Sequence, residues 1–173
     1  MTAQIPENLI YESYRTTMNF CPFLPEDHPR IVELSREEIQ RENIHPMIFS
    51  TACWREYVGT WEVKNGQFYL VRLTGKYKIL GGDPIPADWF SGVLKIPVGK
   101  ILHYVHMGFG TVYEREILVT IEKGKVVNVR VKDNRGKEID HWDQVERSMP
   151  GSEFRSEDDK ENGRSQEKHP NHP

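Results

Sequence analysis

With 173 residues, of which 37% are hydrophobic and 28% charged, the chain is predicted to form one domain with some segments outside its core. Its formal net charge of -3 disfavours nucleic acid as a partner, because no overall positive field would attract phosphates. Neither a signal-peptide pattern nor an apolar run long enough to cross a bilayer occurs, so a soluble cytoplasmic protein without membrane contact is expected.

The first 50 residues are predicted to form an N-terminal arm with one short helix. Ser35 stands three residues before Glu38, the spacing of a helix capping box, so a surface helix is expected over residues 36–42. Prolines interrupt any longer regular element in this stretch: Pro6, Pro22, Pro25, Pro29 and Pro46. An apolar cluster is expected to pack across the following sheet and tie the arm down: Phe20, Phe23 and Leu24.

Residues 51–148 are predicted to be a β-rich core domain, and its clearest element is a hairpin. Strands are expected over residues 56–63 and 67–73, because Asn65-Gly66 between them supplies the positive φ angles of a tight turn. Alternation places four residues on one face of the first strand: Tyr57, Gly59, Trp61 and Val63. The missing side chain at Gly59 should leave room for a large neighbour to lie across it.

The later strands alternate as well. A third strand is expected over residues 90–96, closed by Pro97 and Gly99, and a fourth over 101–107. Residues 114–121 then place Ile117, Val119 and Ile121 on one face, with Glu116, Leu118 and Thr120 on the other, and the next strand should turn Val127, Val129 and Val131 inward and Asn128, Arg130 and Lys132 outward. The sequence therefore predicts a mainly β fold, a strongly bent antiparallel sheet or small open barrel.

Residues 149–173 are predicted to be a disordered tail. Phe154 is the only aromatic residue among them and no aliphatic branch occurs. Such a segment buries too little apolar area to offset its chain entropy.

The two cysteines, Cys21 and Cys53, lie far apart and suggest neither a disulfide framework nor a metal knuckle. A reducing compartment is consistent with this usage. Cys53 is interpreted either as a small buried residue entering a strand or as a nucleophile with His106 as its base.

Three stretches carry a family resemblance. They are residues 51–62, which include Cys53-Trp54-Arg55; Asp88-Trp89-Phe90-Ser91-Gly92; and residues 104–114, which begin Tyr104-Val105-His106-Met107-Gly108. Together they resemble the signature stretches of a bacterial family of short, uncharacterised cytosolic proteins. The resemblance implies a bacterial source and carries no activity with it.

A catalytic interpretation rests on His106. His103 and His106, three residues apart on a strand, would point to opposite sides, so a shared metal ion is not expected, and no cofactor is expected either. Closing the hairpin at Gly108 to Gly110 would set His103 opposite Glu116 and His106 opposite Tyr113. His106 would then be a core histidine or a general base held by a phenol, and Tyr113, Glu114 and Asp88 would complete a small hydrolase or transferase site.

The alternative is a non-catalytic protein-interaction module, and it is the hypothesis that we favour. Aromatic residues are plentiful, whereas no convergent catalytic set can be named. The binding patch would consist of Trp54, Arg55, Tyr57, Trp89 and Phe90. The partner is expected to be another protein, with the chain acting as an inhibitor, an immunity-type antagonist or a mobile-element accessory protein by analogy of type alone.

Overall fold

The computed structural model describes residues 2–137, and the predicted tail at 149–173 lies outside this range. The described chain is mainly β, as predicted. In order, its elements are β1 (Glu7–Tyr11), β2 (Tyr14–Met18), β3 (Ile31–Glu33), α1 (Arg36–Arg41), the 3-10 helix η1 (Pro46–Phe49), β4 (Tyr57–Lys64), β5 (Gln67–Gly75), β6 (Tyr77–Ile79), β7 (Ile85–Pro86), β8 (Gly92–His103), β9 (Val112–Glu122) and β10 (Lys125–Asp133).

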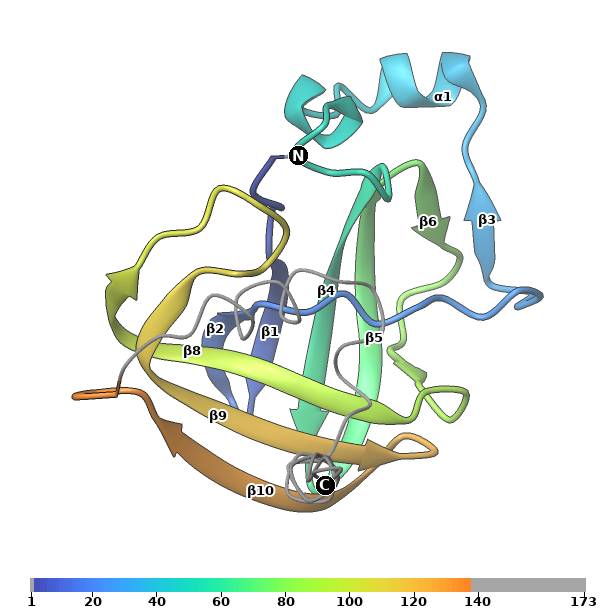
Figure 1. Ribbon diagram of the computed structural model, residues 1–173. Helices are drawn as coiled ribbons and strands as arrows, with labels where there is room; N and C mark the ends of the chain where they lie inside the picture. Colours follow the sequence, from blue (N-terminus) through green and yellow to red (C-terminus); the bar gives the residue numbers. More distant parts are fainter. Residues whose placement is uncertain (1, 138–173) are drawn as a thin grey trace, which may run out of the picture.

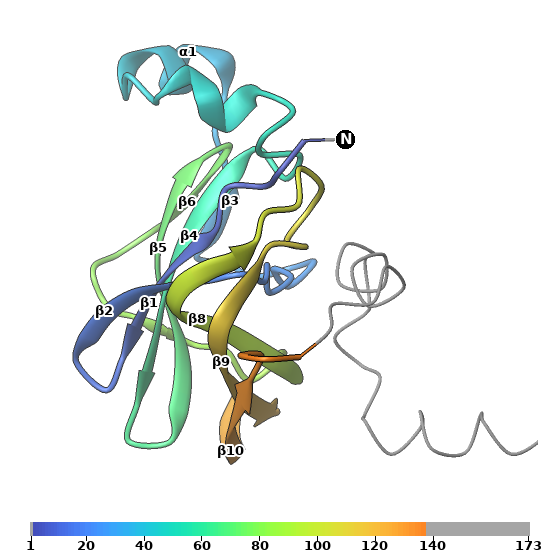
Figure 2. The same cartoon turned by 60° about the vertical axis from the view of Figure 1, so that its left-hand side comes forward.

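The larger sheet curves around a single core without closing into a barrel (Figure 1). Its strand order is β2-β1-β4-β5-β10-β9-β8, with β7 paired to β5. The β10 and β5 strands share one residue pair, Lys125 and Gln67. Figure 2 shows β8, β9 and β10 turning away from the layer that holds β4 and β5. The sheet is therefore strongly bent and open, and β3 pairs with β6 in a small separate sheet.

The predicted N-terminal arm contributes two strands to this sheet. β1 and β2 form a hairpin, and β1 pairs in parallel with β4, so the sheet is mixed rather than purely antiparallel. Beyond β2 the arm crosses the core as expected. The rings of Phe20 and Phe23 lie 5.8 Å and 5.6 Å from that of Phe90, and Leu24 packs against the same cluster.

Two local predictions are confirmed. Asn65 and Gly66 have φ angles of 52° and 72° and join β4 to β5 in a tight hairpin. Ser35 caps α1 in a capping box with Glu38, and this hydrogen bonding, together with Lys78, lowers the pKa of the Glu38 carboxyl to about 2. Within residues 2–137, no helix is long and apolar enough to cross a membrane.

The predicted break after residue 96 is wrong, because β8 runs without interruption from Gly92 to His103. Pro97 is tolerated inside β8 because β8 is the last strand in the order and pairs with β9 alone. A proline, which has no N–H, therefore interrupts no hydrogen bonds to a strand on the other side. Gly99 instead marks an irregularity with a φ of 85°. The register shift that follows places His103 opposite Val112, so the predicted pairing of His103 with Glu116 is also wrong.

Val129 and Val131 of β10 lie opposite Val119 and Ile117 and so face inward as predicted, but they are not buried. A bulge between Val126 and Asn128 shifts the register, and Val126 is the residue that packs against the core. Val127, Val129 and Val131 remain 51%, 45% and 63% exposed. On β9, Val119 and Ile121 are buried as expected, but Glu116 and Leu118 on the opposite face are buried too.

Candidate functional site

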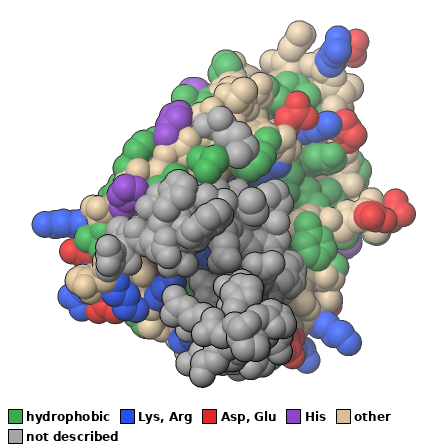
Figure 3. All heavy atoms as spheres, viewed as in Figure 1, with side chains coloured by type: hydrophobic (Ala, Val, Ile, Leu, Met, Phe, Trp, Pro, Cys, Tyr) green, Lys and Arg blue, Asp and Glu red, His purple; other side chains and the backbone are tan. Residues whose placement is uncertain are grey.

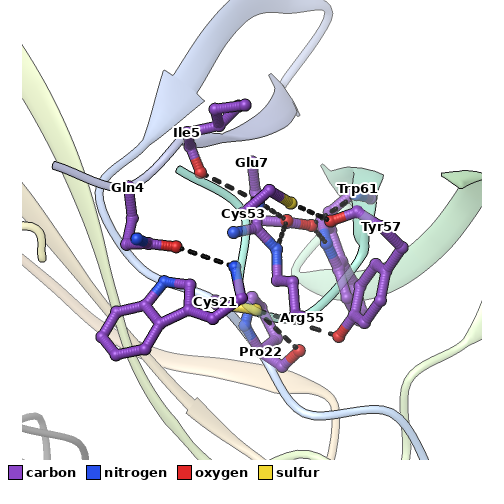
Figure 4. A network of polar contacts seen from close by, with 11 residues as sticks. Gln4, Ile5, Glu7, Cys21, Pro22, Cys53, Arg55, Tyr57 and Trp61 are labelled. Carbon is purple, nitrogen blue, oxygen red and sulfur yellow. Dashed lines mark hydrogen bonds and ion pairs between the residues drawn. The ribbon is translucent and has the colours of Figure 1, made fainter. Parts of the chain in front are cut away.

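A buried carboxylate, Glu7, is the centre of the most extensive side-chain network in the described residues. The parallel register sets Asn8 beside Thr60 and Leu9 beside Trp61, which brings Glu7 at the start of β1 next to Gly59 in β4. Its side chain is fully buried. Figure 4 shows Glu7 among residues from the segment before β1, from β4 and from the loop before β4.

Each donor that points at Glu7 is an N–H group. Its Oε2 accepts hydrogen bonds from the backbone N–H of Gly59 and the indole Nε1 of Trp61, both at 2.7 Å. Its Oε1 accepts from Arg55 Nε at 2.6 Å and pairs with Arg55 Nη2, which also donates to the Ile5 carbonyl at 2.9 Å. Only an ionised carboxylate, which accepts at every position, satisfies this arrangement.

Burial and charge act in opposite directions on this pair. Burial raises the pKa of Glu7, and the Arg55 charge with the hydrogen bonds from Trp61 and Gly59 opposes that rise. Burial alone would lower the pKa of Arg55, but the charge of Glu7, the smaller contributions of the two cysteines and the hydrogen bond to Glu7 together outweigh it, and the pKa is raised. We therefore assign a charged pair at neutral pH, on the strength of the donor geometry.

Gly59 confirms the expectation that something large lies across it. A Cβ at this position would overlap Oε2 of Glu7 and the indole Nε1 of Trp61. The glycine is therefore needed for a carboxylate to approach the backbone of β4.

Both thiols lie at the edge of this network and are protonated. Cys21 Sγ lies 3.8 Å from the Tyr57 hydroxyl, and Cys53 Sγ donates to the Tyr57 carbonyl at 3.2 Å. Burial, followed by the charge of Glu7, raises the pKa of Cys21 to about 12, and burial also raises the pKa of Cys53. Neither environment activates a thiolate, which favours the interpretation of Cys53 as a buried structural residue.

The thiols should therefore react slowly in the native protein. At pH 8 only about one Cys21 in ten thousand would be a thiolate if its pKa is about 12. A disulfide reagent such as DTNB should release almost no chromophore from native protein over minutes, and two equivalents at once in urea. Rapid stoichiometric labelling of the native protein, lost in Cys53→Ser, would restore the nucleophile hypothesis.

The four residues of the predicted catalytic set do not converge. Asp88 lies before β8 and accepts from Gln67 Nε2 at 3.3 Å, at the turn end of the β4–β5 hairpin. His106 lies after the other end of β8, in the loop before β9, and is exposed. Its ring Nδ1 contacts the Tyr104 hydroxyl at 2.9 Å, whereas Tyr113 faces Ile101 and Glu114 accepts from Lys100 N. The Tyr104 hydroxyl does hold the imidazole of His106, but among residues 2–137 none of the other three predicted catalytic residues contacts this pair.

The five residues of the predicted binding patch do not form one surface either. Tyr57 and Phe90 are 6% and 0% exposed and belong to the core, and Arg55 is occupied by Glu7. Trp89 is half-buried and donates to the Phe23 carbonyl at 3.0 Å. It lies toward the turn end of the β4–β5 hairpin, next to Asp88, whereas Trp54 lies beyond the opposite end.

Trp54 remains exposed, and it has exposed apolar neighbours in sequence. Trp54 is 50% exposed, and Met47 and Phe49 of η1 are 53% and 39% exposed. We call these three exposed residues, which lie within eight residues of chain, the Trp54 surface. Figure 3 shows hydrophobic side chains at the surface toward the upper end of the molecule, where η1 and α1 lie in Figure 1.

The backbone beneath the Trp54 surface is fixed by the buried network. Gln4 Oε1 accepts from the Trp54 N–H at 3.1 Å, and Gln4 Nε2 donates to the Thr51 carbonyl at 2.8 Å. On the following side, Arg55 is held by Glu7. Sequence reasoning missed Gln4 and Glu7. The one available signal was the alternation of Glu7 with Leu9 and Tyr11, which places a carboxylate on an apolar strand face.

No protein-family model matches this sequence, and comparison with curated proteins and with solved structures finds no significant match. The functional argument therefore rests on the geometry alone.

Proposed function

We propose that this protein is a non-catalytic protein-interaction module whose binding surface is the Trp54 surface. The observation that carries the proposal is a tryptophan held half in solvent on a backbone that buried groups fix on both sides. Tryptophan is enriched among the residues that dominate binding energy at protein interfaces. A backbone already ordered before binding loses little entropy when a partner docks.

The chemistry of the surface indicates a partner that offers an apolar groove or pocket. Met47, Phe49 and Trp54 present apolar side chains within eight residues of chain. Methionine adapts to irregular partner surfaces, and aromatic rings fill pockets. The narrower expectation of an inhibitor, immunity-type antagonist or mobile-element accessory protein is compatible with such a surface. It stays a proposal that rests on analogy with other proteins of this kind.

The test compares capture from the native host by the wild type and two variants. Trp54→Ala removes the proposed anchor, and Tyr14→Ala is the matched control, because Tyr14 is 72% exposed and lies near the turn end of the β4–β5 hairpin, away from Trp54. A specific partner should be recovered with wild type and Tyr14→Ala and lost with Trp54→Ala. With purified partner, Kd should weaken about 30-fold, the equivalent of a 2 kcal/mol anchor. Equal recovery with Trp54→Ala would refute the proposal.

A further inference from the structure

The apolar inner face of the sheet continues past the core onto β10. Two rows of paired residues show this. In the first row, Leu94 of β8 pairs with Val119 of β9, and Val119 pairs with Val129 of β10. Leu94 and Val119 are fully buried, whereas Val129 is 45% exposed. In the second row, Ile96 of β8 and Val131 of β10 both pair with Ile117 of β9. Ile96 is 3% exposed and Val131 is 63% exposed. We call Val129 and Val131 the valine face.

The valine face is open because β5 does not follow β10. The two strands pair at Lys125 and Gln67, and the Val126 N–H donates to the Gly66 carbonyl at 2.9 Å. No pairing with β5 is found along the rest of β10 in residues 2–137. Two half-exposed β-branched residues beside an open strand edge are a surface that proteins commonly cover.

The chain reverses its direction directly after β10. Lys137 N donates to the Asn134 carbonyl at 3.4 Å, and Gly136 has a φ of 69°, which together describe a four-residue turn. Asn134 is 5% exposed and holds this turn to β9 through bonds to the Tyr113 carbonyl and Glu116. The described chain therefore ends at residue 137 in a turn that directly follows β10 and is held to β9.

Residues 138–149 follow this turn and lie outside the described residues. Their sequence carries apolar residues at intervals of three and four: Ile139, Trp142, Val145 and Met149. It also carries four carboxylates against one arginine, Arg147: Glu138, Asp140, Asp143 and Glu146. These 12 residues outnumber the 9 of β10, so the segment is long enough to pass the valine face.

The charge beside the valine face complements this composition. Arg115 of β9 pairs with Asp133 of β10, which is two residues after Val131. Because paired residues and residues two apart share a face, Arg115 lies on the same face as Val131. Arg135 in the turn adds a second guanidinium, bound to Asp133. We propose that residues 138–149 of this same chain cover the valine face, with their apolar side chains against Val129 and Val131 and their carboxylates toward Arg115.

The test uses Trp142 as a reporter in the full chain. The fluorescence of Trp142 is obtained by subtracting the spectrum of Trp142→Phe from that of the wild type. The subtraction cancels the signal of Trp54, Trp61 and Trp89, which both proteins share. If the proposal holds, Trp142 emits at shorter wavelength than free indole and is protected from acrylamide. The double substitution Val129→Thr/Val131→Thr, which preserves β-branched shape, should abolish that protection. Val58→Thr, a half-buried valine of β4, is the matched control and should leave it intact.

Three results would overturn the proposal. Trp142 could prove as accessible as free indole, or its protection could persist in the Val129→Thr/Val131→Thr variant. Protection that appears only with rising protein concentration, together with a dimer in sedimentation, would assign the valine face to a second copy instead. Far-UV circular dichroism and the buried Trp61 signal verify that each variant is folded. Thr at exposed strand positions is well tolerated.

Discussion

Replacing Gly59 with alanine should lower the free energy of unfolding by about 3 kcal/mol or more. The added Cβ would overlap the carboxylate of Glu7 and the indole nitrogen of Trp61, and neither group can retreat. Glu7 is held by Arg55, and Trp61 is stacked on Phe68 with ring centroids 5.0 Å apart. The variant must therefore break buried hydrogen bonds or distort β4. Urea denaturation followed by circular dichroism measures the change.

Gly82→Ala is the matched control for this substitution. Gly82 has no positive φ, and a Cβ there would meet nothing within 4 Å. Its replacement should change the unfolding free energy by less than about 0.5 kcal/mol. If Gly59→Ala were as stable as Gly82→Ala, the tight approach of Glu7 to the backbone of β4 would be disproved.

Features set by neighbouring residues could be predicted from the sequence. Asn65 and Gly66 readily adopt the positive φ angles of a tight turn, so they favour a hairpin whatever surrounds them. Ser35 and Glu38 cap α1 through contacts between residues only three apart. Gly59 was recognised as an opening in a strand face. The mainly β class follows from many such local signals that agree with one another.

Features set by distant partners could not be predicted. Glu7 accepts from Gly59 across 52 residues of chain through a parallel strand pair, and no local pattern in either segment announces the other. Alternation identified the inner face of β10, but it cannot tell whether another element covers that face. The candidate catalytic set failed for the same reason, because β8 separates Asp88 from His106. Of the proposed patch, only Trp54 kept both exposure and a fixed backbone.

Removing the arginine of the buried pair should have an effect as large as that of Gly59→Ala. In Arg55→Met the Glu7 carboxylate stays buried without its counter-charge, and the free energy of unfolding at pH 7 should fall by about 3–5 kcal/mol. That is a large share of the 5–15 kcal/mol or so by which domains are stable. Adding Glu7→Gln removes the stranded charge and leaves an amide oxygen for Gly59 or Trp61. The double variant should therefore be more stable than Arg55→Met alone, with a coupling of about 0.5–3 kcal/mol.

The pH dependence separates a stranded charge from a loss of packing. Burial already raises the pKa of Glu7 above its ordinary value of 4.5, and losing Arg55 removes the main opposing charge and raises it further. A carboxyl whose folded pKa exceeds its unfolded pKa contributes stability below the unfolded value and loses it as pH rises through the folded value. Arg55→Met should therefore lose stability between about pH 5 and pH 7, whereas Glu7→Gln/Arg55→Met should not. Urea titrations of both variants at the two pH values measure this, and parallel behaviour would mean that Arg55 acts through packing alone.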